Sequence, residues 1–132
     1  MADNPPLMES GASCGFPSPA EQYASTPLDL NTLLVKNPEA TFFVRAEGNS
    51  MTGAGIQNGD ILVVDRSLEP ASGSIVIACI DNEFTVKYLR QDQRGTVLEP
   101  ANPEYPALIL VPGMELRIFG VVTGCIHKFR QP

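Results

Sequence analysis

Residues 74–90 read SIVIACIDNEFTVKYLR, two apolar runs separated by the pair Asp81-Asn82. Both runs are rich in β-branched and aromatic side chains, which are typical of strands. Asparagine tolerates the left-handed backbone conformation that a tight turn often needs. The stretch therefore predicts two β-strands joined by a tight turn.

Further strand-length runs occur from Thr41 onward, and no long helical stripe is visible there. The regular spacing of runs and turn signals predicts a mainly-β domain over residues 41–132, with rolled β-sheets or a partly closed barrel. The additional runs are TFFVRAEG, DILVVD, TVLEP, ALILV and LRIFGVV, and the additional turns are Asn58-Gly59, Ser72-Gly73 and Pro112-Gly113.

Residues 1–40 differ in composition and are expected to form a flexible N-terminal arm. Five of the twelve prolines fall in the first 28 residues, where no apolar periodicity is visible. Within the arm, LDLNTLL at 28–34 predicts a short helix, with Asp29 near its start and Asn37-Pro38 marking its end.

Composition limits the classes of function. A chain of 132 residues with 43% hydrophobic content builds one core. Fifteen acidic and nine basic residues give a net charge of −6, which disfavours attraction to nucleic-acid phosphates. We therefore expect no direct nucleic-acid binding, and any role at DNA would run through a protein partner.

The longest apolar run, Ile75 to Ile80, is too short for a membrane span, and MADNPPLMES does not resemble a signal peptide. A soluble cytoplasmic protein is expected. Cys14, Cys79 and Cys125 lie far apart without a ligand pattern, so the sequence predicts no disulfide and no metal site, and nothing indicates a cofactor. Cys79 and Cys125 lie in apolar runs and are expected to be buried, unlike Cys14.

The stretch EGNSMTGAGIQNGD at 47–60 places four glycines around Ser50. One interpretation is a long glycine-rich connection without chemistry. The other is a serine nucleophile on an irregular turn, where glycines admit a substrate backbone and neighbouring N–H groups can face an oxyanion. Composition leaves both open, although the stretch lacks the spacing and lysine of a P-loop.

A serine nucleophile needs a base, and two residues qualify. His127, the single histidine, lies near the C-terminus, where a structural role is favoured over a Ser-His-Asp triad. Lys87 lies inside a strand-like run, and burial against the Ser50 loop would lower its pKa from about 10.4 toward neutrality. Glu83, Thr85 and Lys87 share one strand face, however, which could simply be solvated.

Four landmarks occur together in a fixed order along most of the chain, from Cys14 to the strand IFGVV. They are CGFPSPA at 14–20, GNSM at 48–51, NGD at 58–60 followed by ILVVD, and EFTVK at 83–87. This ordered set resembles the UmuD-like group of the LexA-like self-cleaving serine peptidases, peptidase S24. The resemblance implies the mainly-β LexA/UmuD-like peptidase fold.

The resemblance also implies roles for individual residues. Ser50 would be the nucleophile and Lys87 the general base of a Ser-Lys dyad. The backbone N–H groups of Asn49 and Ser50 would form the oxyanion hole, and the bond cut would be the chain's own Cys14–Gly15 bond. Cys14 would then precede the scissile bond, and its sulfur would take no part in the reaction.

For the whole protein, the resemblance implies a part in SOS mutagenesis, a response to DNA damage. A RecA filament on single-stranded DNA would act as co-protease, and the truncated homodimer would serve UmuC as accessory subunit of an error-prone translesion polymerase. Two alternatives stay open: a non-catalytic dimeric binding module that regulates a polymerase, and a LexA-like repressor fragment. Only 47 residues precede Gly48, so a repressor would need upstream sequence for its DNA-binding helices.

Overall fold

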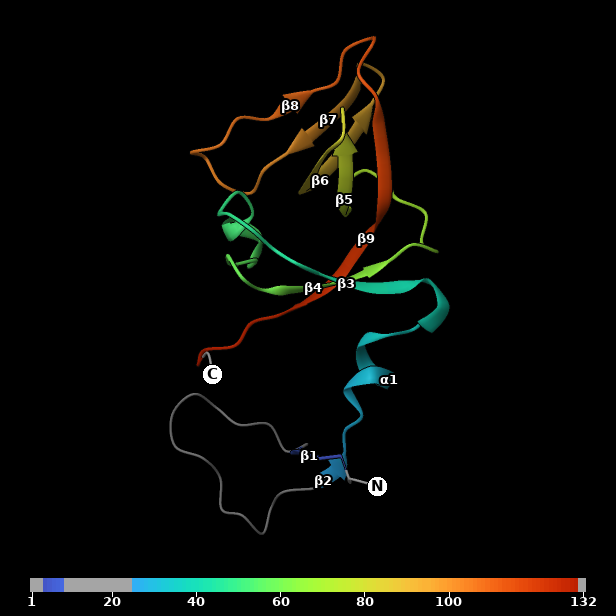
Figure 1. The fold of residues 1–132 in the computed structure, drawn as a ribbon, viewed down its shortest axis with the longest axis vertical. Coiled ribbons are helices and arrows are strands. Elements are labelled where there is room, and N and C mark those ends of the chain that lie inside the picture. The colour runs from blue at the N-terminus through green and yellow to red at the C-terminus, as the bar shows by residue number, and fades with distance from the viewer. Residues whose placement is uncertain (1–3, 9–24, 131–132) are drawn as a thin grey trace. The chain divides into compact units, whose positions relative to one another are not determined.

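The computed structural model describes residues 4–8 and 25–130 and divides the chain into two units, residues 1–36 and 37–132 (Figure 1). The predicted mainly-β class is confirmed, because the larger unit is built on seven strands. Among the described residues, no helix has the length and apolar character needed to cross a membrane.

The first unit contains a short β-ladder. β1 (Pro6–Met8) pairs antiparallel with β2 (Ser25–Pro27), and the Leu28 N–H donates to the Pro5 carbonyl at 2.8 Å. The sequence predicts an irregular arm here, whereas the structure has two strands. The ladder rests on backbone hydrogen bonds and the side chains of β1 are exposed, so no apolar period marks it in the sequence.

The short helix predicted over 28–34 is present as α1 (Leu30–Leu34). Asp29 caps it, because its carboxylate accepts a hydrogen bond from the Asn31 N–H at 2.9 Å. The helix begins two residues later than the predicted run and ends with it at Leu34, before Asn37-Pro38, since Val35 already has an extended backbone.

The second unit is a seven-stranded antiparallel sheet with the order β3-β4-β9-β5-β6-β7-β8. Its strands follow the predicted runs, except that β3 and β8 are shorter and β6 and β9 longer than predicted. Two 3₁₀ helices, η2 and η3, lie in the connections. The bounds are η2 Pro38–Ala40, β3 Thr41–Arg45, η3 Thr52–Ala54, β4 Ile61–Asp65, β5 Ile75–Ile80, β6 Glu83–Asp92, β7 Gly95–Glu99, β8 Leu108–Ile109 and β9 Leu116–Ile126.

The β5–β6 hairpin turns within two residues, as its sequence predicts. Ile80 pairs with Glu83, and the intervening Asp81 and Asn82 have φ angles of 47° and 73°. Positive φ at both central residues is the type I′ pattern, which matches the twist of antiparallel strands. The turn fixes the register of β6, and with it the position of Lys87 along the strand.

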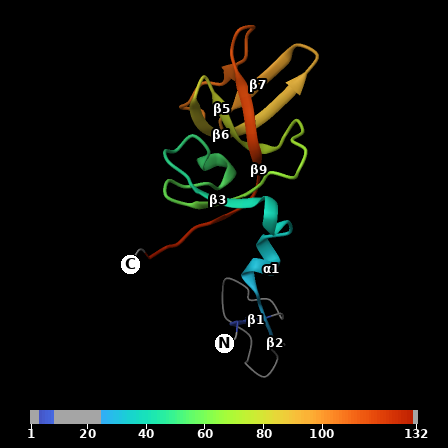
Figure 2. The same ribbon diagram turned by 45° about the vertical axis from the view of Figure 1, so that its right-hand side comes forward.

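β9 joins the two parts of the sheet. Figures 1 and 2 show this long strand passing from β5 to β4, and it pairs with both. The register shifts between Ile77 and Ala78 and again between Val63 and Val64, and such irregularities bend a strand. At Gly120 a Cβ atom would lie 2.6 Å from Val64 Cγ1. Glycine therefore allows β9 to approach β4 this closely.

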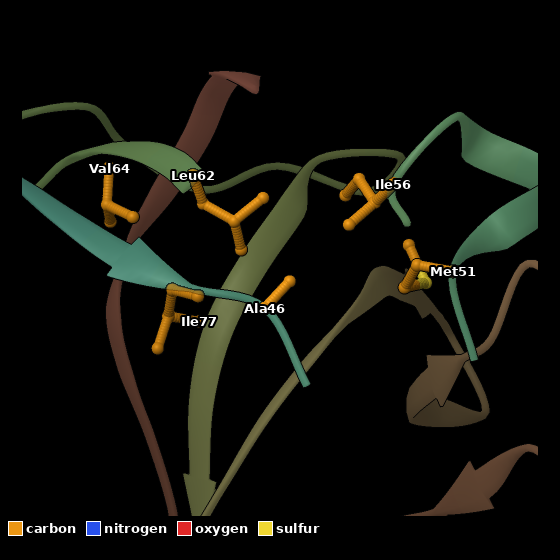
Figure 3. Close-up of a cluster of buried hydrophobic side chains, with 6 residues drawn as sticks. All are labelled: Ala46, Met51, Ile56, Leu62, Val64 and Ile77. Carbon is orange, nitrogen blue, oxygen red and sulfur yellow. The ribbon is translucent and has the colours of Figure 1, made fainter. Parts of the chain in front are cut away.

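Two hydrophobic clusters lie on opposite faces of β5, because successive strand residues point to opposite sides. Ile77 belongs to the first cluster, whereas Val76 and Ala78 belong to the second. Figure 3 shows the first cluster, in which Met51 and Ile56 from the β3–β4 connection pack with residues of the sheet. The glycine-rich connection is thus anchored in the core.

The two cysteines expected to be buried differ. Cys79 on β5 is 4% exposed, as predicted. Cys125 is exposed, so the prediction is wrong for this residue. Cys125 lies near the end of β9, where most of the last strand residues face solvent. An apolar run indicates a strand but does not show which of its ends the rest of the chain covers.

We expect Gly120→Ala to lower the free energy of unfolding by about 1–3 kcal/mol, because the added methyl group overpacks the contact with Val64. Urea denaturation measures the difference. The double variant Gly120→Ala, Val64→Ala should lose less than the sum of the two single losses, since it removes the clashing Cγ1 atom. Additive losses would show that this contact does not limit the packing of β9.

Candidate active site

Lys87 lies on β6, on the face that it shares with Thr85. It pairs across the sheet with Val76, a buried residue of the second cluster. Its side chain is half-buried. The structure therefore rules out a fully solvated Lys87, which strand parity alone had left open.

Ser50 lies in the connection between β3 and β4, and the structure brings it beside Lys87. Lys87 Nζ donates one hydrogen bond to Ser50 Oγ at 2.9 Å and another to Thr85 Oγ1 at 2.6 Å. No pattern in the sequence predicted a role for Thr85. Its only signal is its place two residues before Lys87 on the same strand face.

Burial lowers the pKa of Lys87 below its usual value, because desolvation disfavours the ammonium relative to the neutral amine. In the part of the chain that the structure describes, no carboxylate forms an ion pair with Lys87 to oppose this effect. A neutral amine within hydrogen-bond reach of a hydroxyl can accept its proton. The arrangement of Ser50 and Lys87 therefore suits a nucleophile and its base.

Core packing and backbone hydrogen bonds hold the Ser50 connection. Met51, the next residue, is 3% exposed and packs in the first cluster. The ends of the connection are joined where the Ala46 N–H donates to the Asp60 carbonyl and the Gly59 N–H donates to the Ala46 carbonyl, both at 2.8 Å. Ser50 therefore lies on a supported turn.

The backbone N–H groups of Asn49 and Ser50 are the oxyanion donors that the resemblance implies. Neither has a hydrogen-bond acceptor among residues 4–8 and 25–130. An oxyanion hole requires donors that are fixed beside the nucleophile and free to bind the substrate. These two N–H groups are free to bind a substrate.

Two cavities flank Lys87. One, of about 260 Å³, lies over Ser50 between the end of β3, the Ser50 connection and β6. The other, of about 550 Å³, is lined by β6 together with one apolar side chain each from β5, β7 and β8, namely Ile80, Leu98 and Leu108. Phe84, Thr85 and Lys87 line both. A peptide that occupied both cavities would pass the Ser50–Lys87 pair.

His127, the alternative base, forms its hydrogen bond with Asp60, at 2.5 Å between Nδ1 and Oδ1. The Asp60 side chain is 2% exposed. Burial by itself would raise the pKa of this carboxyl, but the Gln57 N–H and His127 outweigh burial and lower the pKa. His127 thus has a structural contact, and the hydroxyl of Ser50 is bonded to a different residue.

Cys14 and Gly15, the predicted cleavage bond, lie outside the described residues. Within residues 4–8 and 25–130, no group of three or more His, Cys, Asp or Glu side chains could hold a metal ion. The Ser50 hydroxyl and the Lys87 amine are thus the pair of side-chain groups that the structure places in contact for chemistry at this site, with Thr85 bonded to the amine.

Known proteins are similar to this chain over most of its length. Residues 6–123 match the Peptidase S24 family, described as Peptidase S24-like. Protein ImpA of Escherichia coli is 51% identical over 126 residues, which are 96% of this chain and 86% of ImpA. Protein SamA of Salmonella typhimurium is 50% identical over 126 residues, 96% of this chain and 87% of SamA. Protein MucA of Escherichia coli is 48% identical over 112 residues, 84% of this chain and 76% of MucA.

We expect Lys87→Met to be more stable than the wild type near neutral pH, because the variant removes a charge whose burial is unfavourable. The pKa of Lys87 is lower in the folded state than the value of about 10.4 expected for the unfolded chain. The wild type therefore gains stability as the pH rises between these two values. The difference in stability between Lys87→Met and the wild type should therefore decrease as the pH rises.

Urea denaturation near pH 7 and near pH 10 measures this change. Lys36→Met, at an exposed lysine, is the matched control for the loss of a surface charge. A stability difference between Lys87→Met and the wild type that stayed constant with pH would contradict the burial of the Lys87 charge.

Proposed function

The chain belongs to the Peptidase S24-like family, and from this membership we propose that it cuts its own Cys14–Gly15 bond with a Ser50-Lys87 dyad. At the level of the family it is a self-cleaving serine peptidase. The observation that carries the proposal is the 2.9 Å hydrogen bond between Lys87 Nζ and Ser50 Oγ, at a position where burial lowers the pKa of the lysine.

In the first half of the reaction, neutral Lys87 accepts the hydroxyl proton of Ser50 while Oγ attacks the carbonyl carbon of Cys14. The carbonyl oxygen becomes an oxyanion, which the N–H groups of Asn49 and Ser50 stabilise. The C–N bond to Gly15 then breaks, and Lys87 gives the proton to the departing nitrogen. The products are an ester on Ser50 and a free amine at Gly15.

In the second half, a water molecule attacks the ester carbonyl while Lys87 accepts a proton from it. The Ser50–acyl bond breaks, the proton returns to Oγ, and residues 1–14 leave as a carboxylate. Thr85 accepts a hydrogen bond from Lys87 Nζ at 2.6 Å and so holds the amine in place through both halves.

The two cavities supply room for the segment around the scissile bond. A peptidase needs an extended and uncrowded substrate backbone, and CGFPSPA offers one glycine and two prolines, which disfavour a helix. Residues on either side of the bond would occupy the cavities of about 260 and 550 Å³, which adjoin each other at Lys87.

The wider role that we propose is in SOS mutagenesis. A RecA filament on single-stranded DNA stimulates the cleavage, and the truncated chain forms a homodimer that acts as accessory subunit of a UmuC-like translesion polymerase. The resemblance to UmuD-like proteins, together with the similarity to ImpA, SamA and MucA, supports this role. The net charge of −6 agrees with a protein that acts at DNA through protein partners.

We expect the purified chain, incubated with RecA, ATP and single-stranded DNA, to give a product of 118 residues (132 − 14) that begins at Gly15. Ser50→Ala and Lys87→Ala should each lower the rate by at least about 10³-fold, since each removes one half of the dyad. Intact-mass spectrometry and N-terminal sequencing identify the products.

Cys14→Ala is the matched control, because it keeps the scissile bond and removes only the thiol. It should be cleaved at a rate close to that of the wild type. Cleavage that persisted in Lys87→Ala would show that another group is the base. A wild-type chain that never cleaved under these conditions would favour a non-catalytic binding module.

The rate of self-cleavage without RecA should rise with pH and level off once Lys87 is neutral. Because burial lowers the pKa of Lys87, the midpoint should lie below the value of about 10.4 for an exposed lysine. First-order rate constants across neutral and alkaline pH give the profile, with Ser50→Ala as the blank for uncatalysed hydrolysis. A rate that fell as the pH rose would rule out Lys87 as the base.

A further inference from the structure

We propose that Asn102 is a positioning residue that fixes and polarises the peptide group whose N–H would bind the oxyanion. This inference rests on the proposed function, because it concerns how the Ser50 connection would stabilise the reaction intermediate. Asn102 lies in the segment that follows β7, and no pattern in the sequence predicted a role for it.

The Asn102 side chain bonds to the peptide group between Asn49 and Ser50. Asn102 Nδ2 donates to the Asn49 carbonyl oxygen at 2.7 Å and lies 3.4 Å from Thr52 Oγ1. The Asn49 carbonyl and the Ser50 N–H belong to a single planar amide. A donor that holds the carbonyl oxygen therefore also sets the direction in which the N–H points.

The same hydrogen bond makes the Ser50 N–H a stronger donor. A donor at the carbonyl oxygen draws electron density toward that oxygen and leaves the N–H of the amide more positive, which is the cooperative effect of hydrogen-bond chains. An oxyanion carries more negative charge than the carbonyl from which it forms. A stronger donor therefore stabilises the intermediate more than it stabilises the bound substrate.

The segment that carries Asn102 is itself fixed against the Ser50 connection. The Ala101 N–H donates to the Ser50 carbonyl at 2.8 Å, and the Gly53 N–H donates to the Ala101 carbonyl at 2.7 Å. A Cβ atom on Gly53 would lie 2.5 Å from that carbonyl oxygen. Because Gly53 has no side chain, the backbone of the Ser50 connection can lie directly against the backbone at Ala101.

The amide of Asn102 is oriented by a second hydrogen bond. Its Oδ1 accepts from the Glu104 N–H at 2.9 Å. With Oδ1 turned toward Glu104, Nδ2 faces the Asn49 carbonyl. Nδ2 and Oδ1 of Asn102 therefore make separate hydrogen bonds, and a substitution can remove one of these bonds and keep the other.

The hydrogen bonds of the peptide groups at Asn49 and Ser50 agree with this role of Asn102. The carbonyls of Asn49 and Ser50 are bonded to the segment formed by Ala101 and Asn102. The N–H groups of Asn49 and Ser50 have no acceptor in the described part of the chain. The acceptor side of these peptides is thus occupied by protein, while the donor side stays available to a substrate in the adjoining cavity.

Asn102→Asp removes the Nδ2 donor and keeps the Oδ1 acceptor but adds a negative charge, so it is compared with the uncharged variant Asn102→Ala. Aspartate has the same shape, keeps an oxygen for the Glu104 N–H and places an acceptor against the Asn49 carbonyl. Asn102→Ala removes both bonds. We expect the plateau rate of self-cleavage at alkaline pH to fall about 10- to 100-fold in both variants, which is less than the ~10²–10³-fold loss for an oxyanion donor itself. Plateau rates are compared because Lys87 is then neutral in every variant.

Two further readouts separate positioning from a general loss of structure. Asn102→Ala should keep the midpoint of the pH–rate profile, since the midpoint reports the pKa of Lys87. Pro103→Ala, which changes the adjacent residue but leaves the amide in place, should cleave at the wild-type rate. The melting temperature of each variant shows how much of it is folded.

A plateau rate within about twofold of the wild type for Asn102→Ala or for Asn102→Asp would overturn the proposal. Rate losses that merely followed the loss of folded protein in both variants would also overturn it. Cleavage that survived in Ser50→Ala would instead reject the proposed function. Cleavage that was lost in Ser50→Ala and retained in Asn102→Asp would reject the role of Asn102 alone.

Discussion

The hydrogen bond between Lys87 Nζ and Ser50 Oγ joins two segments 37 residues apart, and the proposed function of the larger unit depends on it. A lysine can serve as a base only where burial disfavours its charge, and a buried amine needs acceptors for its hydrogens. Ser50 and Thr85 are those acceptors. Both are hydroxyls, which satisfy the amine without stabilising the ammonium as strongly as a carboxylate would.

The Ser50 side of this hydrogen bond is supported both by the core and by the end of the chain. Met51 is buried beside the serine. Asp60, at the end of the connection, accepts a hydrogen bond from the Gln57 N–H at 2.8 Å and bonds to His127, which follows β9. A buried carboxylate is unfavourable without such partners. Here one partner, Gln57, lies in the Ser50 connection and the other, His127, follows β9, so the carboxylate links the connection to the segment after β9.

The features that the sequence predicted are those with a local cause. The Asp81-Asn82 turn follows from the backbone preference of its residues, and the run on β5 follows from its side chains. The pairing of Ser50 with Lys87 has no local cause, because strand parity cannot tell whether a distant connection covers a given face. Only the family resemblance placed these two residues together. The contact of Asn102 depends in the same way on how two connections meet, and no pattern in either one marks it.

Under the proposed function, the geometry also indicates where control of the reaction must act. Nucleophile, base and unbonded N–H groups are already in position among the described residues of the larger unit. An activator therefore has no catalytic group to move there. A partner shifts an equilibrium only as far as its affinity differs between the two states. A partner that speeds self-cleavage must then favour the state in which the Cys14–Gly15 bond occupies the cavity beside Ser50. The rate would depend on the partner through docking of the substrate segment, while the chemistry at Lys87 stays the same.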